Sequence, residues 1–286
     1  MPKAPSVWTV LSMMEWATDF FEEKQVKSPR FSIEWLLAHV LSIKRLDLYL
    51  EYDRPLSSEE LELLRPLVKR RAAHEPLQYI TGETDFHTVK IKVKSGVLIP
   101  RQETEQLVDW ILEQFHDKEE LKVLDIGTGS GCIPIALKNA RPSWQIFATD
   151  ISEEALTIAR ENAHYNEVDI SFLKDDLFQT HSLNDHVFDL IISNPPYIHP
   201  EEKKSLDNEV KNFEPELALF CESTQKMYQA LETLSSNFLA QSGTVFLELH
   251  ENHSQEVLHI FQESNWSANI KNDYEGKPRF LRAKKA

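Results

Sequence analysis

The segment from residue 121 to residue 139 restricts the possible folds of this chain more than any other. An apolar run at 121–126 predicts a buried strand, and residues 132–139 have the composition of a helix. Between them lie Gly127, Thr128, Gly129, Ser130 and Gly131. Glycine lets the main chain approach a ligand closely, and a helix start offers free N–H groups. This order predicts an α/β sheet with a site for a nucleotide-like ligand.

The spacing of these glycines distinguishes between two classes of ligand. A dinucleotide site has the pattern G-x-G-x-x-G, with an acidic residue about 20 positions later. Here Cys132 stands where that third glycine belongs, and Asp125 precedes a G-x-G-x-G pattern. This spacing fits S-adenosylmethionine better. Asp150, at the end of the next predicted strand (145–149), is expected to accept hydrogen bonds from both ribose hydroxyls.

A further acidic turn follows the short strand predicted at 169–173. Because the strands of such a sheet end at one edge, this turn is expected beside the adenine. Asp176 is predicted to accept a hydrogen bond from the exocyclic amine, and Leu177 to pack on the ring. For Asp175, an exposed turn without ligand contact is the alternative interpretation.

The second unusual segment closes another predicted strand, which begins at residue 187. It consists of Asn194, Pro195, Pro196 and Tyr197. Prolines fix φ and have no N–H to donate, so the loop is stiff and its carbonyls stay free to accept hydrogen bonds. The Asn194 side chain adds an acceptor and Tyr197 a flat face. Such a cradle suits a planar group that carries an –NH2; a strand end closed by prolines, without a ligand, is the alternative.

The rest of the chain predicts three parts. Residues 1–76 are expected to form a small helical domain, with helices at 6–25, from Ser28 to residue 43, and from Ser57 to about residue 74. Ser28 is expected to cap its helix ahead of Pro29, and Ser57 to form a capping box with Glu60. Residues 77–100 are expected to form a linking β-hairpin, because lysines alternate with apolar residues at 86–94.

Residues 101–286 are predicted to form the α/β domain. Helices are expected at 104–115, 153–165, 224–239 and 254–262, and strands at 243–249 and twice more before the end. The polar, proline-punctuated segment 200–222 is expected to be a flexible flap near the site.

The composition indicates where in the cell this protein is expected. The 286 residues are 41% hydrophobic, and no apolar run approaches the length of a membrane-spanning helix. Glu15 and Asp19 interrupt the first twenty residues, which argues against a signal peptide. Two cysteines, Cys132 and Cys221, offer neither a disulfide framework nor a metal-binding spacing. We expect a cytoplasmic protein without a metal site.

The formal charge of −15 is unevenly distributed. Residues 1–76 hold 12 acidic and 11 basic residues, whereas residues 77–286 hold 34 acidic and 20 basic residues. A part of the chain this acidic repels nucleic acid at long range. No stable binding of nucleic acid is therefore expected.

Four segments together carry a family resemblance. They are the glycine-rich turn after Asp125, the Asn194–Tyr197 loop, residues 76–82 (PLQYITG) and residues 97–105 (VLIPRQETE). The chain resembles the peptide chain release factor glutamine methyltransferases over essentially its whole length. The resemblance implies a class I, Rossmann-like methyltransferase domain with a seven-stranded, mostly parallel sheet that has one antiparallel strand.

The resemblance also implies an activity and its residues. Methyl transfer is expected from S-adenosylmethionine to the side-chain amide nitrogen (N5) of the GGQ-motif glutamine of a release factor, by a monomeric enzyme. Residues 127–131, Asp150, Asp176, Leu177 and Asn194 are expected to bind the cofactor. Asn194, Pro195, Pro196 and Tyr197 are expected to hold the glutamine, and three of them, Asn194, Pro195 and Tyr197, to be catalytic.

The chain departs from the family pattern at three places. Gln102 stands where proline is usual, residues 221–224 (CEST) replace a glycine-rich segment, and His250 replaces glycine. None of these removes a proposed catalytic group. Two alternatives remain: an amino-methyltransferase of adenine or guanine in nucleic acid, and a non-catalytic protein that binds S-adenosylmethionine.

Overall fold

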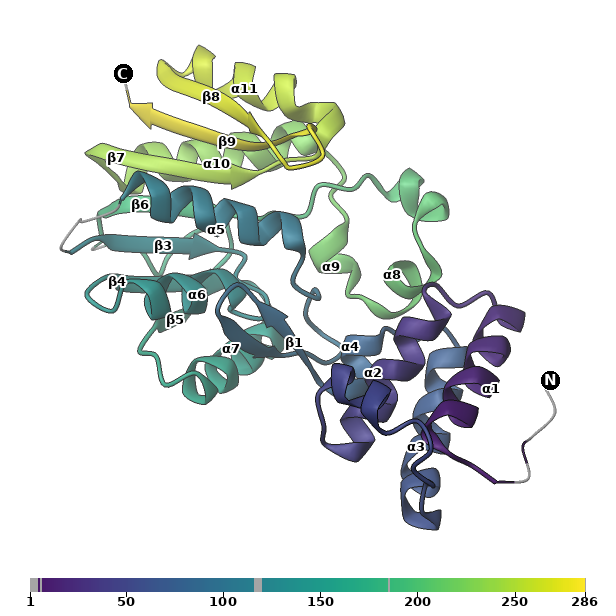
Figure 1. Ribbon diagram of the computed structural model, residues 1–286. Helices are drawn as coiled ribbons and strands as arrows, with labels where there is room; N and C mark the ends of the chain where they lie inside the picture. Colours follow the sequence, from purple (N-terminus) through teal and green to yellow (C-terminus); the bar gives the residue numbers. More distant parts are fainter. Residues whose placement is uncertain (1–4, 6, 116–119, 185, 286) are drawn as a thin grey trace. The chain divides into compact units, whose positions relative to one another are not determined.

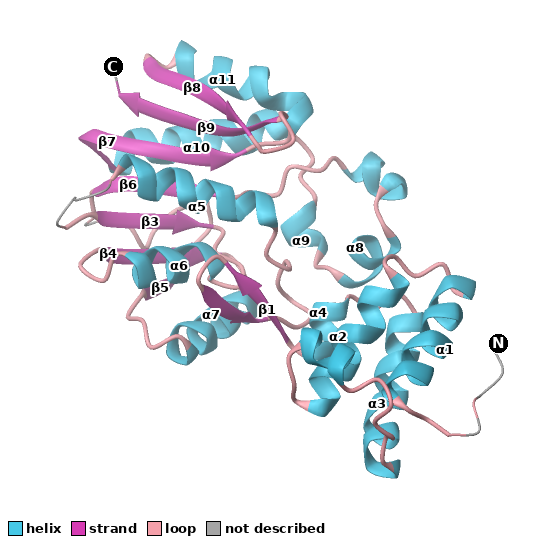
Figure 2. Cartoon of the chain, viewed as in Figure 1, coloured by secondary structure: helices cyan, strands magenta, loops and turns pink. Residues whose placement is uncertain are grey.

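The computed structural model describes residues 5, 7–115, 120–184 and 186–285, and the chain forms two compact units (Figure 1). The first unit comprises residues 1–82 and 207–213, and the second comprises residues 83–206 and 214–286. The first unit is helical (Figure 2). Its elements are α1 (Val10–Glu23), α2 (Pro29–Leu41), the 3-10 helix η1 (Arg45–Leu50), α3 (Ser58–Ala72), α4 (Leu77–Thr81) and α8 (Asn208–Phe213).

Two predicted helix starts in this unit have different outcomes. Ser57 and Glu60 form the predicted capping box, with each side chain accepting from the other residue's N–H at 3.1 and 2.8 Å. Ser28 precedes Pro29 as predicted, but its side chain makes no capping hydrogen bond and its φ is +50°. Ser28 thus occupies the predicted N-cap position, but its left-handed backbone does not aim the hydroxyl at the helix N–H groups.

The helical unit includes a segment that is distant in sequence. The guanidinium of Arg71, in α3, is buried and donates to Ser32 Oγ at 2.9 Å and to Glu209 Oε1 at 2.8 Å. A buried charge requires partners of this kind, and Glu209 lies in α8. Lys27 pairs with Asp207 at 2.9 Å. Segment 207–213 therefore belongs to the helical unit.

Two sequence expectations need correction here. The predicted hairpin linker began at residue 77, but residues Leu77–Thr81 form α4, and the hairpin is confined to β1 (Glu83–Phe86) and β2 (Val89–Lys92). The sequence pattern did not reveal α4, because a helix of only five residues is too short to show a helical repeat of apolar positions. The predicted flexible flap at 200–222 contains three short helices: η2 (Pro200–Ser205), α8 and α9 (Glu216–Leu219).

The second unit contains the predicted seven-stranded sheet, in the order β5-β4-β3-β6-β7-β9-β8. Its strands are β3 (Lys122–Ile126), β4 (Gln145–Asp150), β5 (Ser171–Lys174), β6 (Phe188–Ser193), β7 (Leu239–Glu248), β8 (Trp266–Asn272) and β9 (Pro278–Lys285). β9 alone runs against the others in this sheet, which confirms the expected single antiparallel strand.

Helices cover both faces of this sheet (Figures 1 and 2). They are α5 (Gln102–Gln114), α6 (Cys132–Ala140), α7 (Glu153–Tyr165), α10 (Thr224–Phe238) and α11 (Ser254–Glu263), with the 3-10 helix η3 (Glu251–His253) before α11. Successive residues of β7 alternate between the faces. Phe246 contacts Trp110 of α5, with ring centroids 5.0 Å apart, whereas Leu247 packs with α10 and α11.

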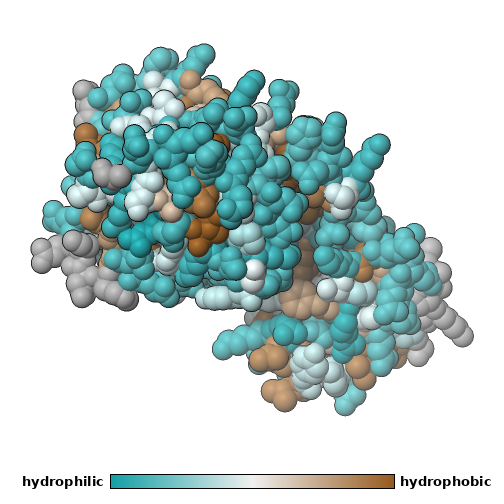
Figure 3. Space-filling model, turned by 90° about the horizontal axis from the view of Figure 1, so that it is seen from above, coloured by the Kyte–Doolittle hydropathy of each residue, from teal (hydrophilic) through white to brown (hydrophobic). Residues whose placement is uncertain are grey.

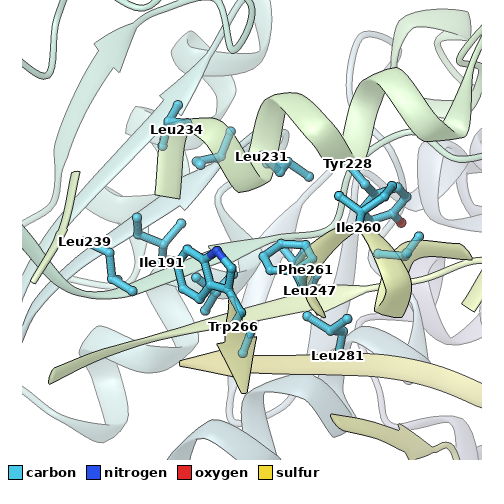
Figure 4. Close-up of a cluster of buried hydrophobic side chains, with 14 of the residues drawn as sticks. Ile191, Tyr228, Leu231, Leu234, Leu239, Leu247, Ile260, Phe261, Trp266 and Leu281 are labelled. Carbon is cyan, nitrogen blue, oxygen red and sulfur yellow. The ribbon is translucent and has the colours of Figure 1, made fainter. Parts of the chain in front are cut away.

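A hydrophobic core lies between the sheet and the pair α10–α11 (Figure 4). Tyr228, Leu231 and Phe261 of these helices pack on Ile191 and Leu281 of the strands. The surface in the view of Figure 3 is mostly hydrophilic, consistent with a mean hydropathy of −0.40. Among the described residues, no helix is both long and apolar enough to cross a membrane.

Candidate active site

A cavity of about 500 Å³ lies at the carboxyl edge of the sheet, within the second unit. β3, β4 and β6 are parallel, so the residues that follow them meet at this edge, as predicted. Gly127 and Gly129 line the cavity after β3, Asp150 lines it at the end of β4, and Asn194 lines it after β6. The size of the cavity suits a nucleoside-like ligand.

The three glycines of the turn have different roles. All have positive φ values, of +73° at Gly127, +54° at Gly129 and +81° at Gly131. A Cβ atom at Gly127 or Gly129 would meet no protein atom within 4 Å, so both leave space beside the cavity. At Gly131 a Cβ would lie 3.1 Å from Ala159 Cβ.

Gly131 is also absent from the residues that line the cavity, while Thr128 and Ser130 are among them. The structure therefore does not place Gly131 with the other predicted cofactor residues. The absence of a side chain there allows α6 to approach α7 closely.

Asp150 holds the turn in place and also forms part of the cavity wall. Its Oδ2 accepts from the Gly129 N–H at 2.8 Å, and its Oδ1 accepts from the Ser152 N–H at 2.9 Å. Burial raises the pKa of this carboxyl, and both backbone hydrogen bonds oppose that rise. Each carboxylate oxygen has a further lone pair, so the two oxygens can accept from a pair of ribose hydroxyls.

Asp125 lies below the turn, and its environment bears on whether the site suits a cationic cofactor. It is 1% exposed, and neither of its carboxylate oxygens has a hydrogen-bond partner among the described residues. Burial raises its pKa to about 7; Thr128 Oγ1 comes near and lowers the pKa slightly, without hydrogen-bond geometry. Asp125 is not among the residues that line the cavity, so its attraction to the positive charges of S-adenosylmethionine would act through the turn and not by direct contact.

The acidic turn after β5 also reaches the cavity, since both Asp176 and Leu177 line it. Asp176 Oδ1 accepts from the Phe178 N–H at 2.9 Å, which leaves Oδ2 for a ligand donor. Asp175 accepts from the Thr180 hydroxyl and from the His181 N–H, at 3.0 Å for the latter. Asp175 lines the cavity as well, but its hydrogen bonds with the chain close the turn.

Asn194 is held by a chain of hydrogen bonds. Its Nδ2 donates to Thr104 Oγ1 at 3.1 Å, and the Thr104 hydroxyl donates to Glu248 Oε2 at 2.7 Å. A hydroxyl has one proton, so Thr104 can only accept from Asn194. Asn194 Oδ1 is therefore left to accept from a ligand in the cavity. Pro195 and Pro196 line the same wall.

Tyr197 is not among the residues that line the cavity. Its hydroxyl donates to Glu248 Oε1 at 3.3 Å, and its ring lies 5.7 Å from the ring of His250. Burial raises the pKa of this phenol, which keeps it a hydrogen-bond donor near neutral pH. Of the four residues of the loop, the structure brings three to the cavity wall and ties the fourth to Glu248.

Four residues that support this site were not predicted from the sequence. Thr104 and Glu248 orient Asn194, as described above. The buried Glu214 accepts from the Ile99 N–H at 3.3 Å and pairs with Arg101 at 2.5 Å, which fastens the chain before α9 to the cavity wall. Glu248 could have been recognised as an acidic residue at the end of the apolar strand β7. The other three residues have no such feature in the sequence.

Comparison with known proteins agrees with this geometry. Residues 12–82 match the family model described as PrmC N-terminal domain, and residues 90–213 match the methyltransferase small domain. A release factor glutamine methyltransferase from Chlorobaculum tepidum is 37% identical over 285 residues, covering 96% of this chain and 97% of that protein. One from Lactococcus lactis is 40% identical, covering 89% and 94% respectively.

Solved structures share the fold over about two thirds of the chain. The hMettl16 catalytic domain superposes with a TM-score of 0.54 at 16% identity, over 69% of this chain and 76% of that one. A methyltransferase from Pyrococcus furiosus superposes with a TM-score of 0.51 at 18% identity, over 69% and 90%. The predicted fold class is thus confirmed.

The relatives decide the family, because their identity exceeds 35% and extends through both units. The predicted resemblance is confirmed. This chain belongs to the release factor glutamine methyltransferases, a family of S-adenosylmethionine-dependent enzymes.

Proposed function

We propose that this protein transfers the methyl group of S-adenosylmethionine to the side-chain amide nitrogen of the GGQ-motif glutamine of a peptide chain release factor. One observation carries the proposal: Asn194 donates its Nδ2 proton to Thr104 and so turns Oδ1 toward the cavity that Gly127, Gly129 and Asp150 also line. An acceptor in that position suits a substrate that carries an –NH2.

The cofactor supplies an electrophilic methyl group on its sulfonium. Gly127 and Gly129 give it room, and Asp150 accepts from its ribose. Asp176 and Leu177 lie where the adenine is expected, and Thr128 and Ser130 complete the wall of the turn. Asp125 lies buried beneath the turn, and burial raises its pKa to about 7.

The loop after β6 orients the substrate. An amide nitrogen is a poor nucleophile, because its lone pair is delocalised into the carbonyl. Asn194 Oδ1 and the Pro195 carbonyl each accept one N–H of the glutamine and aim its nitrogen at the methyl group. Both acceptors favour the positive charge that develops on nitrogen during transfer, and the methylated nitrogen then releases one proton to solvent. Pro196 stiffens the loop, and Tyr197 packs on the amide plane once substrate is bound.

Charge supports a protein partner. The acidic excess in residues 77–286 favours a basic protein surface over a phosphate backbone. The helical unit, nearly neutral, is proposed as a second contact with the release factor. We further propose that the enzyme acts as a monomer in the cytoplasm, where its two unpaired cysteines remain reduced.

Mass spectrometry of a release factor after incubation with enzyme and labelled cofactor tests the proposal. We expect one methyl group on the GGQ glutamine and none on a release factor with that glutamine changed to alanine. Efficient methylation of naked DNA or ribosomal RNA, or of the alanine variant, would contradict it.

A further inference from the structure

Glu248 joins two parts of the proposed substrate site, although it does not line the cavity. It is the last residue of β7 and is 1% exposed. Oε2 accepts from the Thr104 hydroxyl at 2.7 Å, and Oε1 accepts from the Tyr197 hydroxyl at 3.3 Å. One carboxylate thus accepts hydrogen bonds from α5 and from the loop after β6.

The direction of these hydrogen bonds determines which atom Asn194 offers to the substrate. The Thr104 hydroxyl donates its one hydrogen bond to Glu248, so it can only accept from Asn194, and Nδ2 must face it. If Glu248 donated to Thr104 instead, the Thr104 proton would be free to bond Asn194 Oδ1. The Asn194 amide would then turn over and present Nδ2, a donor, to a substrate that also donates.

We infer that Glu248 is a positioning residue, which orients the Asn194 amide through Thr104 and anchors Tyr197, by accepting from both hydroxyls. The inference rests on the proposed function, because it assigns how the substrate acceptor of that reaction is held. It gives the buried acid a role that does not require contact with substrate.

The surroundings of Glu248 make this arrangement sensitive to pH. Burial raises its pKa to about 7; Thr104 and the positive charge of Arg279, on β9, oppose the rise, and Glu103, on α5, adds to it. Arg279 itself donates to Asp273 at 3.2 Å.

Two other titratable groups near Glu248 stay neutral. The pKa of Tyr228, whose hydroxyl donates to the Glu248 carbonyl oxygen at 2.8 Å, is raised by burial, and burial raises the pKa of the Cys132 thiol to about 12. Below about pH 7, the protonated Glu248 can no longer accept from both hydroxyls, and transfer should slow.

Glu248→Gln tests the inference, because an amide of the same shape accepts through only one of its two polar atoms. We expect kcat for release factor methylation to fall between about 10-fold and 100-fold, with cofactor Kd within about twofold. The kcat of the unchanged enzyme should decline below about pH 7, and that decline should be absent in the variant.

The matched control is Glu103→Gln, which removes a neighbouring charge but neither hydrogen bond. This variant should retain full kcat. The decline of its kcat at acidic pH should begin at a slightly lower pH, because Glu103 raises the pKa of Glu248. If Glu248→Gln does not fold, two variants of Thr104 test the inference instead. Thr104→Ser keeps the hydroxyl and should preserve kcat. Thr104→Val removes it and should lower kcat between about 10-fold and 100-fold.

The outcomes separate the two claims. An unchanged enzyme that does not methylate any release factor overturns the proposed function. If the enzyme is active, two results would overturn the positioning role alone. One is a Glu248→Gln variant that keeps both its kcat and its loss of kcat below about pH 7. The other is a Thr104→Val variant with the same kcat as Thr104→Ser.

Discussion

The two walls of the cavity are built from different parts of the chain. Around Gly127 and Gly129 the wall is main chain, held by the Asp150 carboxylate 21 residues from Gly129. Around Asn194 the wall depends on side chains, and Thr104 lies 90 residues from Asn194 in sequence. The first wall follows from one strand–turn–helix unit, and the second forms only when α5, β6 and β7 pack together. Substitutions should therefore affect cofactor binding in the first wall and transfer rate in the second.

The largest expected effect is on the side-chain wall. Asn194→Ala removes one acceptor for the substrate amide, so methyl transfer should fall by roughly two to three orders of magnitude. Cofactor affinity should change much less, because the turn after β3 is untouched. Single-turnover rates and calorimetry with the cofactor measure both. Near-normal turnover would show that the loop is structural only.

The corresponding change in the main-chain wall is Asp150→Ala. It should weaken cofactor binding by about 1.5–3 kcal/mol, the range for a charge-assisted hydrogen bond. Loss of the tie to the Gly129 N–H contributes, because the turn is then free to move. Glu153→Gln, exposed at the start of α7, is the matched control for calorimetry. Unchanged affinity in a folded Asp150→Ala protein would remove Asp150 from the site.

Two glycine variants separate ligand space from packing within one turn. Gly131→Ala should lower the free energy of unfolding by about 2 kcal/mol, because a positive φ and the 3.1 Å contact with Ala159 both oppose a Cβ atom. Gly129→Ala should cost only about 1 kcal/mol of stability, from its φ alone, but should weaken cofactor binding. Denaturant unfolding and calorimetry on both proteins measure this. Equal loss of affinity in the two variants would place Gly131 in the site after all.

The smallest effect concerns Asp125. Burial raises its pKa from 3.8 to about 7, so the folded state binds this proton more tightly than the unfolded state. Its contribution to stability is therefore full below about pH 4 and is lost as pH rises through 7. Asp125→Asn, which cannot ionise, should gain stability over the unchanged protein as pH rises from about 4 through 7, and the gain should already be measurable at pH 5. Urea unfolding of both proteins without cofactor measures the difference in their free energies of unfolding. A difference that does not change with pH would contradict the raised pKa of Asp125.

Local sequence determined most of the main-chain wall. Strand β3, the glycine-rich turn, α6 and Asp150 are contiguous or nearly so, and their types follow from periodicity and backbone freedom. The capping box of Ser57 and the position of the proline-rich loop at a strand end were predictable for the same reason. Each depends on interactions among residues a few positions apart.

Only the tertiary structure decided three other features. Glu248 supports Asn194 because β7 and α5 meet, Gly131 serves packing because α7 lies against α6, and segment 207–213 joins the helical unit through a hydrogen bond spanning 138 residues. Such contacts leave no periodic pattern in the sequence. A buried hydrogen bond is specified by the position of its partner in space, and that position exists only after the helices and strands have packed.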